Sequence, residues 1–314
     1  MKVLVLGNVH PKGLDILTAF ADVTVLPEPV ARDDVLAHIG DVDGMLHKVG
    51  RIDAEIIAGQ SRLRVIARHG VGLDDLDLRS IATAGIPVST TETANSNAVA
   101  EATVGYALSL LRHFGRADDM VKHDHSWARE SLMGRELSNC TVGVVGYGRI
   151  GRLVAGYLAA FGADVLINDD NDAALTDIPY RAASLDELLR TSDVVSLHCP
   201  LTPKTRHLID GPRLKLMHEH AVLINTARGA LIDQDALAEA LTERAIGGAA
   251  LDVFEAEPPN FDDPLFACPN LITTPHVAAM TFEAQTAMAV QAASEIRKVL
   301  VEGREPSNNV ATTE

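Results

Sequence analysis

Residues 141–151 read Thr141-Val142-Gly143-Val144-Val145-Gly146-Tyr147-Gly148-Arg149-Ile150-Gly151. A short β-branched run leads directly into three glycines with the spacing Gly-x-Gly-x-x-Gly, and a helical apolar pattern follows at 153–158. Gly146 permits a tight turn, Gly148 lets the backbone approach a pyrophosphate, and Gly151 allows the helix to pack closely on the strand. This stretch therefore predicts a strand–turn–helix unit that binds a dinucleotide.

The residues around this turn indicate which dinucleotide it takes. The amides of Arg149 and Ile150 are expected at the positive end of the following helix, where an anion is stabilised. Asp169 ends the next predicted strand, 18 residues beyond Gly151, near where a ribose-binding carboxylate is expected. Asp170 and Asp172 add negative charge, which repels a 2′-phosphate. We therefore predict NAD rather than NADP.

Short apolar runs alternate with helical patterns on both sides of the turn. This alternation is typical of βαβ units on parallel sheets and predicts an α/β fold. The predicted strands are Val3–Leu6, Val23–Leu26, Gly44–His47, Arg64–Ala67, 141–145, Val165–Asn168, Val194–Leu197, Ala221–Asn225, Gly248–Leu251 and Leu271–Thr273. Long helices are predicted at 98–112 and from about Phe282 to Val301, and the polar tail Ser307–Glu314 is expected to fray.

The bulk composition excludes several classes of protein. The chain has 314 residues, is 47% hydrophobic and carries a formal charge of −16, so it can bury a large core but lacks the basic footprint of a nucleic-acid binder. Three scattered cysteines form no disulfide framework, which fits a reducing cytoplasm. No apolar run approaches the length of a signal peptide core or a membrane span.

Three polar residues that follow later strands are candidates for catalysis. Arg228 follows the strand at 221–225, where a guanidinium can hold a carboxylate bidentately. Glu257 follows the next strand, and His276 follows the last one. A histidine paired with a carboxylate is a general acid or base near neutral pH, although sequence alone cannot pair these two.

At this point the chain resembles the D-2-hydroxyacid dehydrogenases, and within them the 3-phosphoglycerate dehydrogenase branch. The resemblance covers nearly the whole chain. Its motifs, besides the glycine turn, are Arg68-His69-Gly70-Val71-Gly72-Leu73-Asp74, Asn95 to Glu101, Ser196-Leu197-His198-Cys199-Pro200-Leu201-Thr202, Asn225 to Gly229, Asp252 to Pro258, and Thr274-Pro275-His276. Ala278-Ala279-Met280 departs from the family, where many relatives carry glycines and a Ser or Thr.

The resemblance implies a role for each motif. It implies that His276 is the acid/base, that Glu257 hydrogen-bonds it, and that Arg228 holds substrate oxygens. The backbone around Val71 and Gly72 would grip the substrate carboxylate. Further cofactor-pocket positions implied by the family are His198, Cys199, Pro200, Thr205, Thr226, Ala227, Asp252 and Thr103.

The resemblance also implies two doubly wound parallel-sheet domains. A Rossmann cofactor domain at 98–281 would be inserted into a flavodoxin-like substrate domain made of 1–97 and 282–314. A homodimer is implied, and the Ala/Leu-rich helix at 98–112 is a candidate surface for it.

The substrate is left open between a phosphorylated acid and a small acid without a phosphate. Lys48, Arg68 and Arg129 stand where phosphoglycerate-type relatives often carry arginines, although scattered surface cations explain them equally well. The chain is also expected to lack the regulatory domain that some of those relatives have. Glyoxylate, hydroxypyruvate and 3-phosphoglycerate are all compatible with the sequence.

Two other functions compete with an NAD-dependent dehydrogenase. One is a non-catalytic NAD(H)-sensing protein of the same fold, against which the presence of Arg228, Glu257 and His276 argues. The other is a metal-dependent enzyme, suggested by His218-Glu219-His220 and His123-Asp124-His125. An i, i+2 pair does not share a helix face and neither motif has a clear third ligand, so no metal is expected.

Overall fold

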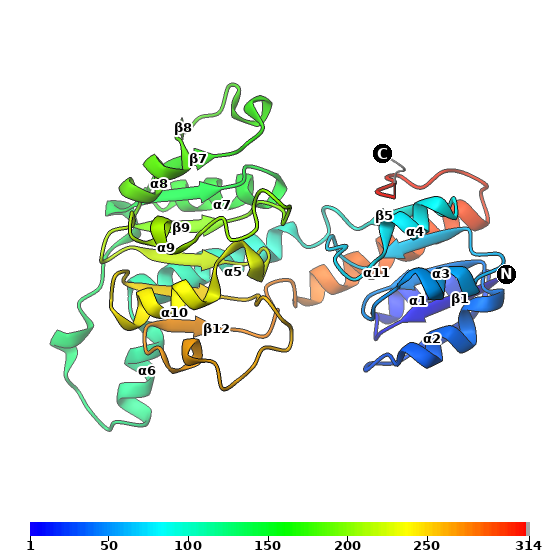
Figure 1. Ribbon diagram of the computed structural model, residues 1–314, viewed down its shortest axis with the longest axis horizontal. Helices are drawn as coiled ribbons and strands as arrows, with labels where there is room; N and C mark the ends of the chain where they lie inside the picture. Colours follow the sequence, from blue (N-terminus) through cyan, green and yellow to red (C-terminus); the bar gives the residue numbers. More distant parts are fainter. Residues whose placement is uncertain (312–314) are drawn as a thin grey trace. The chain divides into compact units, whose positions relative to one another are not determined.

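The computed structural model describes residues 1–311 and divides into two compact α/β units (Figure 1). Unit 1 consists of Met1–Asn95 together with the chain from Met280 onward, and unit 2 consists of Ser96–Ala279. The sheets are parallel throughout, with five strands in one and seven in the other. The expected pair of doubly wound parallel-sheet domains is confirmed.

Unit 1 has the strand order β2-β1-β3-β4-β5, which is the flavodoxin-like order. Its strands are β1 (Lys2–Leu6), β2 (Asp22–Leu26), β3 (Gly44–His47), β4 (Val65–Arg68) and β5 (Val88–Thr90). Its helices are α1 (Pro11–Thr18), α2 (Arg32–His38), α3 (Ala54–Gly59), α4 (Leu78–Thr83) and α11 (Phe282–Leu300). The sequence did not predict β5, which is only three residues long.

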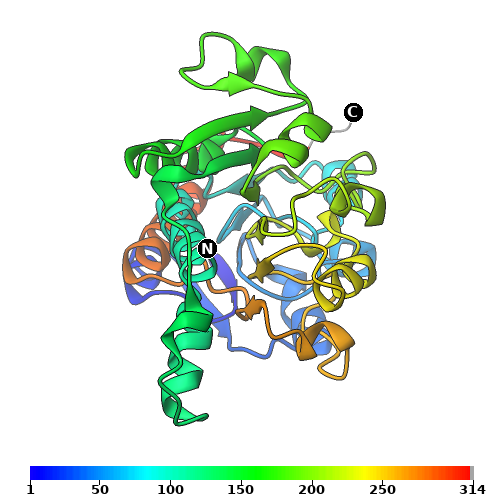
Figure 2. The same cartoon turned by 90° about the vertical axis from the view of Figure 1, so that its left-hand side faces the viewer.

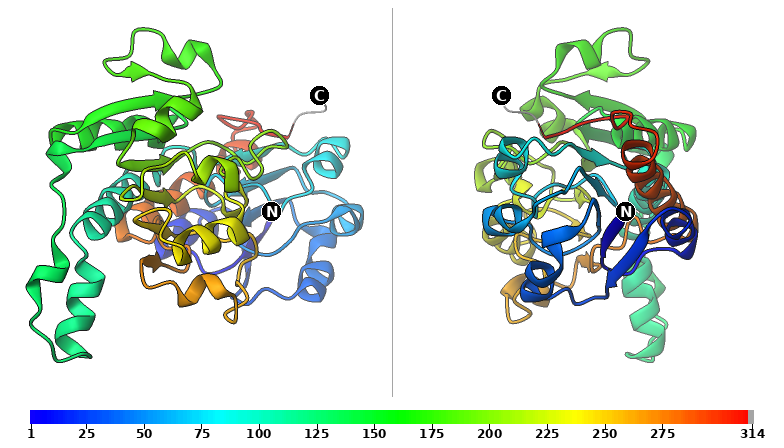
Figure 3. Two further views of the ribbon diagram at one scale, coloured as in Figure 1. Left: turned by 60° about the vertical axis from the view of Figure 1, so that its left-hand side comes forward. Right: turned by 90° about the vertical axis from the view of Figure 1, so that its right-hand side faces the viewer.

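The central strand of unit 1 is buried on both faces. Val3 and Val5 of β1 belong to the core beneath α1 and α11, whereas Leu4 and Leu6 belong to the core beneath α2, α3 and α4. Successive side chains of a strand point to opposite faces, so an unbroken apolar run is what a doubly covered parallel strand requires. Figure 3 shows α1 and α11 side by side on one face.

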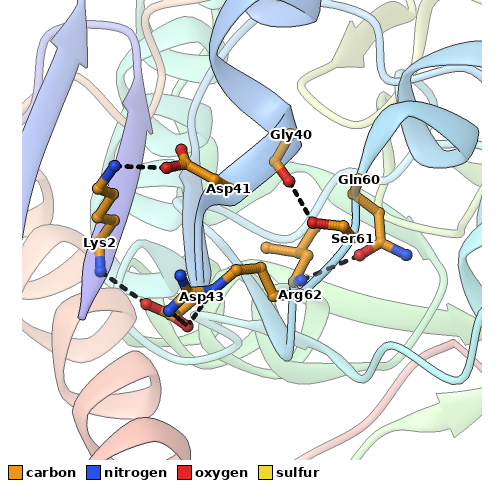
Figure 4. Close-up of polar contacts among 8 residues, drawn as sticks. Lys2, Gly40, Asp41, Asp43, Gln60, Ser61 and Arg62 are labelled. Atoms are coloured by element: carbon orange, nitrogen blue, oxygen red, sulfur yellow. Dashed lines mark hydrogen bonds and ion pairs between the residues drawn. The ribbon is translucent and has the colours of Figure 1, made fainter.

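An ionic cluster ties together the amino ends of the unit 1 strands (Figure 4). The backbone N–H of Lys2 donates to Asp43 Oδ2 at 2.7 Å, and Arg62 Nη2 donates to Asp43 Oδ1 at 2.6 Å. The Lys2 ammonium pairs with Asp41. The charges at this edge are thereby used in holding strands together.

The tail of the chain after α11 is anchored rather than frayed. Ser307 donates from its N–H and its hydroxyl to the buried Glu295 of α11, at 2.7 and 2.6 Å. Asn308 and Asn309 accept from the amides of Thr90 and Val88 at 3.1 and 3.0 Å. The expectation of fraying is wrong for 307–311, because these polar side chains pair the open edge of β5; the rest of the predicted frayed segment, 312–314, lies outside the described residues.

Unit 2 has the strand order β12-β11-β10-β9-β6-β7-β8, the order of the dinucleotide-binding fold with one added strand. Its strands are β6 (Thr141–Val145), β7 (Asp164–Asn168), β8 (Arg181–Ala182), β9 (Val194–Leu197), β10 (Val222–Asn225), β11 (Gly248–Leu251) and β12 (Leu271–Thr273). Its helices are α5 (Ser96–Leu111), α6 (Phe114–Lys122), α7 (Arg149–Ala160), α8 (Leu185–Thr191), α9 (Gly211–Leu214) and α10 (Gln234–Thr242). The strand order reverses between β6 and β9, which is where ligands of such sheets bind.

One face of helix α5 is buried within its own unit. Ala100, Val104, Ala107 and Leu110 pack into the core that α5 and α7 form over one face of the sheet. These contacts account for the apolar residues on the buried face of α5. They do not test the prediction of this helix as a dimer surface, which stays a prediction.

The segment after α5 projects from the sheet of unit 2 as an arm (Figure 2). It contains α6 and continues to about residue 135. Phe114, Val121, Trp127 and Met133 are exposed along it, with Trp127 at 76% and Met133 at 83%. The arm presents more apolar surface than α5 does.

Candidate active site

The glycine turn joins β6 to α7 as the sequence predicts. Gly146 has φ +94°, and a Cβ there would lie 2.5 Å from the amide nitrogen of Cys199. A Cβ on Gly151 would lie 2.0 Å from the carbonyl oxygen of Gly146. Gly148 caps α7, and its Cβ position has no atom within 4 Å. The turn is closed against the protein at two glycines and open at the third, which fits the approach of a pyrophosphate to the helix N-terminus.

Asp169 lies beside this turn at the end of β7. Its Oδ2 accepts from the amide of Tyr147 at 2.6 Å, and its Oδ1 accepts from the amide of Asn171 at 2.9 Å. These bonds fix the carboxylate next to the open glycine. Its remaining lone pairs can accept from ribose hydroxyls.

His276 and Glu257 form a hydrogen-bonded pair. His276 Nδ1 lies 2.7 Å from Glu257 Oε2, and the other carboxylate oxygen accepts from the amide of Phe254 at 3.1 Å. The hydrogen bond that His276 donates to Glu257 raises the pKa of His276 above 6.5, while burial opposes this rise. Burial works to raise the pKa of Glu257, but the hydrogen bond and charge of His276 outweigh it, and this pKa is lowered. The pair is therefore poised to carry a proton on the imidazole near neutral pH.

Asp252 holds the segment that carries the histidine. It is 1% exposed, and it accepts from Thr274 Oγ1 at 2.6 Å and from the amides of Val277 and Ala278 at 2.8 and 2.9 Å. The backbone N–H of His276 donates to the carbonyl of Asp252 at 2.9 Å. Its contacts make Asp252 the anchor of the acid/base loop, and its expected place in the cofactor pocket stays a prediction.

Sequence reasoning missed the side chains that complete this anchor. Tyr106 of α5 has its hydroxyl 2.7 Å from Thr274 Oγ1 and 3.4 Å from Asp252 Oδ1. Tyr106 precedes Asp252 by 146 residues and belongs to no local motif. Only the packing of α5 over the sheet brings it here.

Arg228 follows β10 at the same edge of the sheet. Its Nη1 donates to the carbonyl of Ala227 at 2.6 Å, and Asn225 Nδ2 donates to the carbonyl of Arg228 at 2.8 Å. The charge of Arg228 acts on both Glu257 and His276. The three residues selected from their positions after strands are thus brought together in unit 2.

The remaining predicted cofactor residues line the same edge. Thr103 is fully buried, donates to the Val99 carbonyl at 2.9 Å and lies 3.2 Å from the hydroxyl of Thr226. Thr205 donates to the carbonyl of Pro200 at 2.7 Å and so closes its own loop.

Two side chains at the start of the same loop, which follows β9, are held in their neutral forms. Burial raises the pKa of Cys199 to about 11 and lowers the pKa of His198 to about 3. His198 Nε2 lies 2.8 Å from Ser196 Oγ. The amide of Ala227 donates to Asn225 at 3.0 Å.

A cavity of about 400 Å³ adjoins the acid/base pair. Glu257 and His276 form part of its wall together with Thr273 and Thr274. The rest of the wall is apolar and consists of Phe254, Phe261, Phe266, Pro258, Pro259 and Pro275.

The predicted substrate residues of unit 1 lie at the carboxyl ends of its strands. Val71 and Gly72 follow β4 in a loop that Thr91 holds: the amide of Gly70 donates to Thr91 Oγ1 at 2.8 Å. Lys48 follows β3, and Arg68 is the last residue of β4. Arg129 is exposed on the arm of unit 2.

Both cations of unit 1 are paired with acids of their own unit. Lys48 Nζ lies 2.8 Å from Glu28 Oε1 and donates to the carbonyl of Asn8. Arg68 Nη1 donates to Asp75 Oδ2 at 3.0 Å and to the Nδ1 of the buried His47 at 2.8 Å. These contacts hold both side chains and neutralise their charges.

Neither a metal cluster nor a membrane helix is found in the part of the chain that the structure describes. Over residues 1–311, no group of three His, Cys, Asp or Glu side chains could hold an ion. His218 and His220 stack on each other, with ring centroids 5.2 Å apart, and His220 pairs with Asp193. Across the same residues, no helix is both long and apolar enough to cross a membrane.

Comparison with known proteins agrees with this geometry. The family described as D-isomer specific 2-hydroxyacid dehydrogenase, NAD binding domain, matches residues 104–278. The chain belongs to the D-2-hydroxyacid dehydrogenase family. Its NAD-binding domain contains the glycine turn, Asp169, Arg228, Glu257 and His276.

Several members of the family resemble the whole chain. A glyoxylate reductase of Thermofilum pendens is 39% identical over 95% of this chain and 91% of its own length. A D-3-phosphoglycerate dehydrogenase of Methanocaldococcus jannaschii is 38% identical over 96% of this chain, which spans only 57% of that relative. The crystal structure of the TT0316 protein from Thermus thermophilus superposes with a TM-score of 0.93 at 38% identity and covers 99% of this chain and 100% of its own.

Proposed function

We propose that this protein interconverts a small D-2-hydroxy acid and the corresponding 2-oxo acid, using NAD. The observation that carries the proposal is the His276–Glu257 pair, 2.7 Å apart, with the pKa of His276 raised. It lies in the unit that carries the NAD turn, and Arg228 acts on both members. NAD, which the glycine turn and Asp169 would hold, would supply or accept the hydride of this reaction.

The pairing with Glu257 indicates which ring nitrogen of His276 exchanges a proton with the substrate. A carboxylate can only accept a hydrogen bond, so Glu257 requires a proton on His276 Nδ1. Nε2 is then the nitrogen that gives its proton to the carbonyl oxygen during reduction and takes it back during oxidation. Glu257 stabilises the charged imidazole and fixes its orientation.

The other residues position the substrate. The guanidinium of Arg228 polarises the carbonyl and holds the substrate carboxylate. In unit 1, the amides of Val71 and Gly72 are proposed to bind a substrate carboxylate. Asp169 is proposed to accept from the ribose of NAD, because its carboxylate lies beside the open glycine.

The charges of unit 1 favour a substrate without a phosphate. A phosphate bound at this edge of unit 1 would need cations that are free to bind it. Lys48 is paired with Glu28, and Arg68 with Asp75, so the two pairs carry no net charge. We therefore place glyoxylate or hydroxypyruvate ahead of a phosphorylated acid. The similarity to a D-3-phosphoglycerate dehydrogenase keeps 3-phosphoglycerate as the second candidate.

A panel of substrates tests the activity. NADH oxidation is measured with glyoxylate, hydroxypyruvate and 3-phosphohydroxypyruvate, and we expect the highest kcat/KM with one of the first two. His276→Ala is expected to lose about 10²- to 10⁴-fold in turnover while it still binds NADH. A wild-type chain that binds NADH but reduces none of these acids would instead be an NAD-sensing protein.

A homodimer is proposed through the arm of unit 2. Phe114, Val121, Trp127 and Met133 expose apolar surface that a second copy of the chain would cover. Size-exclusion chromatography with light scattering should show a dimer, and Trp127→Ser with Met133→Ser should shift it toward monomer.

A further inference from the structure

A second histidine–glutamate pair lies beside the first. His207 Nε2 is 2.7 Å from Glu255 Oε1, the same separation as in the His276–Glu257 pair. Glu255 and Glu257 belong to one loop, which follows β11. His207 belongs to the loop that follows β9. The loop that presents Glu257 is therefore held from a second side.

Both histidines have a left-handed backbone. His207 has φ +50° and His276 has φ +55°, a conformation that non-glycine residues adopt only when their surroundings impose it. The amide of His207 donates to the carbonyl of Ala230 at 2.8 Å. The imidazole is thus fixed to the loop after β10 by its backbone and to the loop after β11 by its ring.

A close backbone contact completes the arrangement. A Cβ on Gly229 would lie 1.9 Å from the carbonyl carbon of Phe254 and 2.4 Å from the amide nitrogen of Glu255. The loop after β10, which carries Arg228, therefore rests directly on the loop after β11. The hydrogen bond between the side chains of His207 and Glu255 supports this backbone contact.

We propose that His207 is a positioning residue: through Glu255 it holds the loop that presents Glu257 to His276. The two pairs have different roles. The carboxylate of Glu257 orients the acid/base, and the carboxylate of Glu255 fixes the loop. The inference rests on the proposed dehydrogenase activity. It differs from a surface ion pair, which contributes little and would leave the chemistry unchanged.

The proposal is tested by the pH dependence of kcat/KM for reduction, together with the titration of His276 followed by NMR in the cofactor-free protein. His207→Phe keeps a planar ring but removes the contact with Glu255, and Glu255→Leu removes the other partner. Glu257, Asp252 and Arg228 are the charged groups that act on His276. Both variants should weaken the hydrogen bond between Glu257 and His276 and so lower the pKa of His276. The falling limb of the profile, where kcat/KM decreases as the pH rises, should therefore move to lower pH by about half a unit.

Three comparisons separate positioning from general destabilisation. Glu255→Gln keeps an acceptor for His207 and should stay close to wild type. His207→Phe combined with Glu257→Gln should move the limb no further than Glu257→Gln alone, because both act through one contact. His220→Phe breaks a histidine–carboxylate pair of the same length, with Asp193, and should leave the limb in place.

A limb that stays in place in both His207→Phe and Glu255→Leu would overturn the proposal, and so would a shift that adds to that of Glu257→Gln. If either variant does not fold, the other and the NMR titration decide. Failure of the proposed function looks different, since the wild-type chain would then reduce no 2-oxo acid while His276 still titrates in the NMR experiment.

Discussion

His276 of unit 2 differs in proton affinity from His47 and His69 of unit 1, although all three lie near the carboxyl ends of strands. In unit 2 the hydrogen bond that His276 donates to Glu257 raises the pKa of the half-exposed imidazole. In unit 1 burial lowers the pKa of His47 and of His69 to about 4. His276 of unit 2 is thus prepared for proton transfer, whereas His47 and His69 of unit 1, like the buried His198 of unit 2, are kept neutral.

The partners of each ring explain the difference. His47 Nδ1 accepts from Arg68 and its Nε2 donates to the carbonyl of Gly50, a pattern that only the neutral ring can satisfy. His276 faces a carboxylate, which favours the charged ring. A histidine after a parallel strand is therefore an acid/base candidate only when its partner is an acid.

The largest effect is expected where the carboxylate is removed from His276. Reduction needs the protonated imidazole, so kcat/KM should fall as the pH rises through the raised pKa of His276. In Glu257→Gln the raising influence is lost and burial still lowers that pKa. We expect about 10²-fold lower kcat/KM at neutral pH and a falling limb at lower pH.

The pH profile of Glu257→Gln is the decisive measurement here. Glu255→Gln changes a neighbouring carboxylate of the same loop and serves as the control. An unchanged limb in Glu257→Gln would break the contrast between the two units, because it would show that the partner does not set the proton affinity of His276.

A smaller effect is expected on the stability of unit 1 in acid. The unfolded chain protonates His47 near pH 6.5, whereas the folded chain resists protonation down to about pH 4. The contribution of His47 is therefore complete above pH 6.5 and is lost as the pH drops toward 4, by roughly 3 kcal/mol. His47→Gln keeps a donor and an acceptor without titrating, so it should weaken the pH dependence of unit 1 and leave the part that is due to His69.

Hydrogen exchange in β1 and β3, corrected for intrinsic rates, measures this stability. Fluorescence would not report it, because Trp127 and all four tyrosines lie in unit 2. The exposed His38 of unit 1 provides the control variant His38→Gln, which should keep the wild-type slope. Equal slopes in wild type and His47→Gln would show that burial does not hold His47 neutral.

Much of the fold was predictable because parallel strands buried on both faces are unbroken apolar runs. The β1 residues Val3 to Leu6 and the strand before the glycine turn are of this kind. The three-residue β5 and its partner segment 307–311 were not predictable, since the polar Asn308 and Asn309 resemble a loop until their side chains meet the strand.

The candidate site was predictable in position but not in pairing. Arg228, Glu257 and His276 each follow a strand, and parallel strands end at one edge. The contacts that set their chemistry join distant segments: Glu257 with His276 across 19 residues, and Tyr106 with Asp252 across 146. Likewise, Glu28 and Asp75 neutralise the positive charges of Lys48 and Arg68. No local motif reveals these two ion pairs.

The prediction with the smallest expected effect tests whether the ion pair with Glu28 keeps Lys48 from binding substrate. If Lys48 only binds Glu28 and the carbonyl of Asn8, Lys48→Met should change KM for glyoxylate and hydroxypyruvate by less than about threefold, the scale of one partly exposed ion pair.

Glu28→Gln is the complementary variant. It frees the Lys48 ammonium, so KM for 3-phosphohydroxypyruvate should fall about two- to fivefold while KM for glyoxylate stays the same. Steady-state kinetics with the three acids separates the cases. If Lys48→Met loses more than about tenfold in kcat/KM for the phosphorylated acid alone, Lys48 already binds phosphate. The edge of unit 1 would then be a charged site rather than a neutral one.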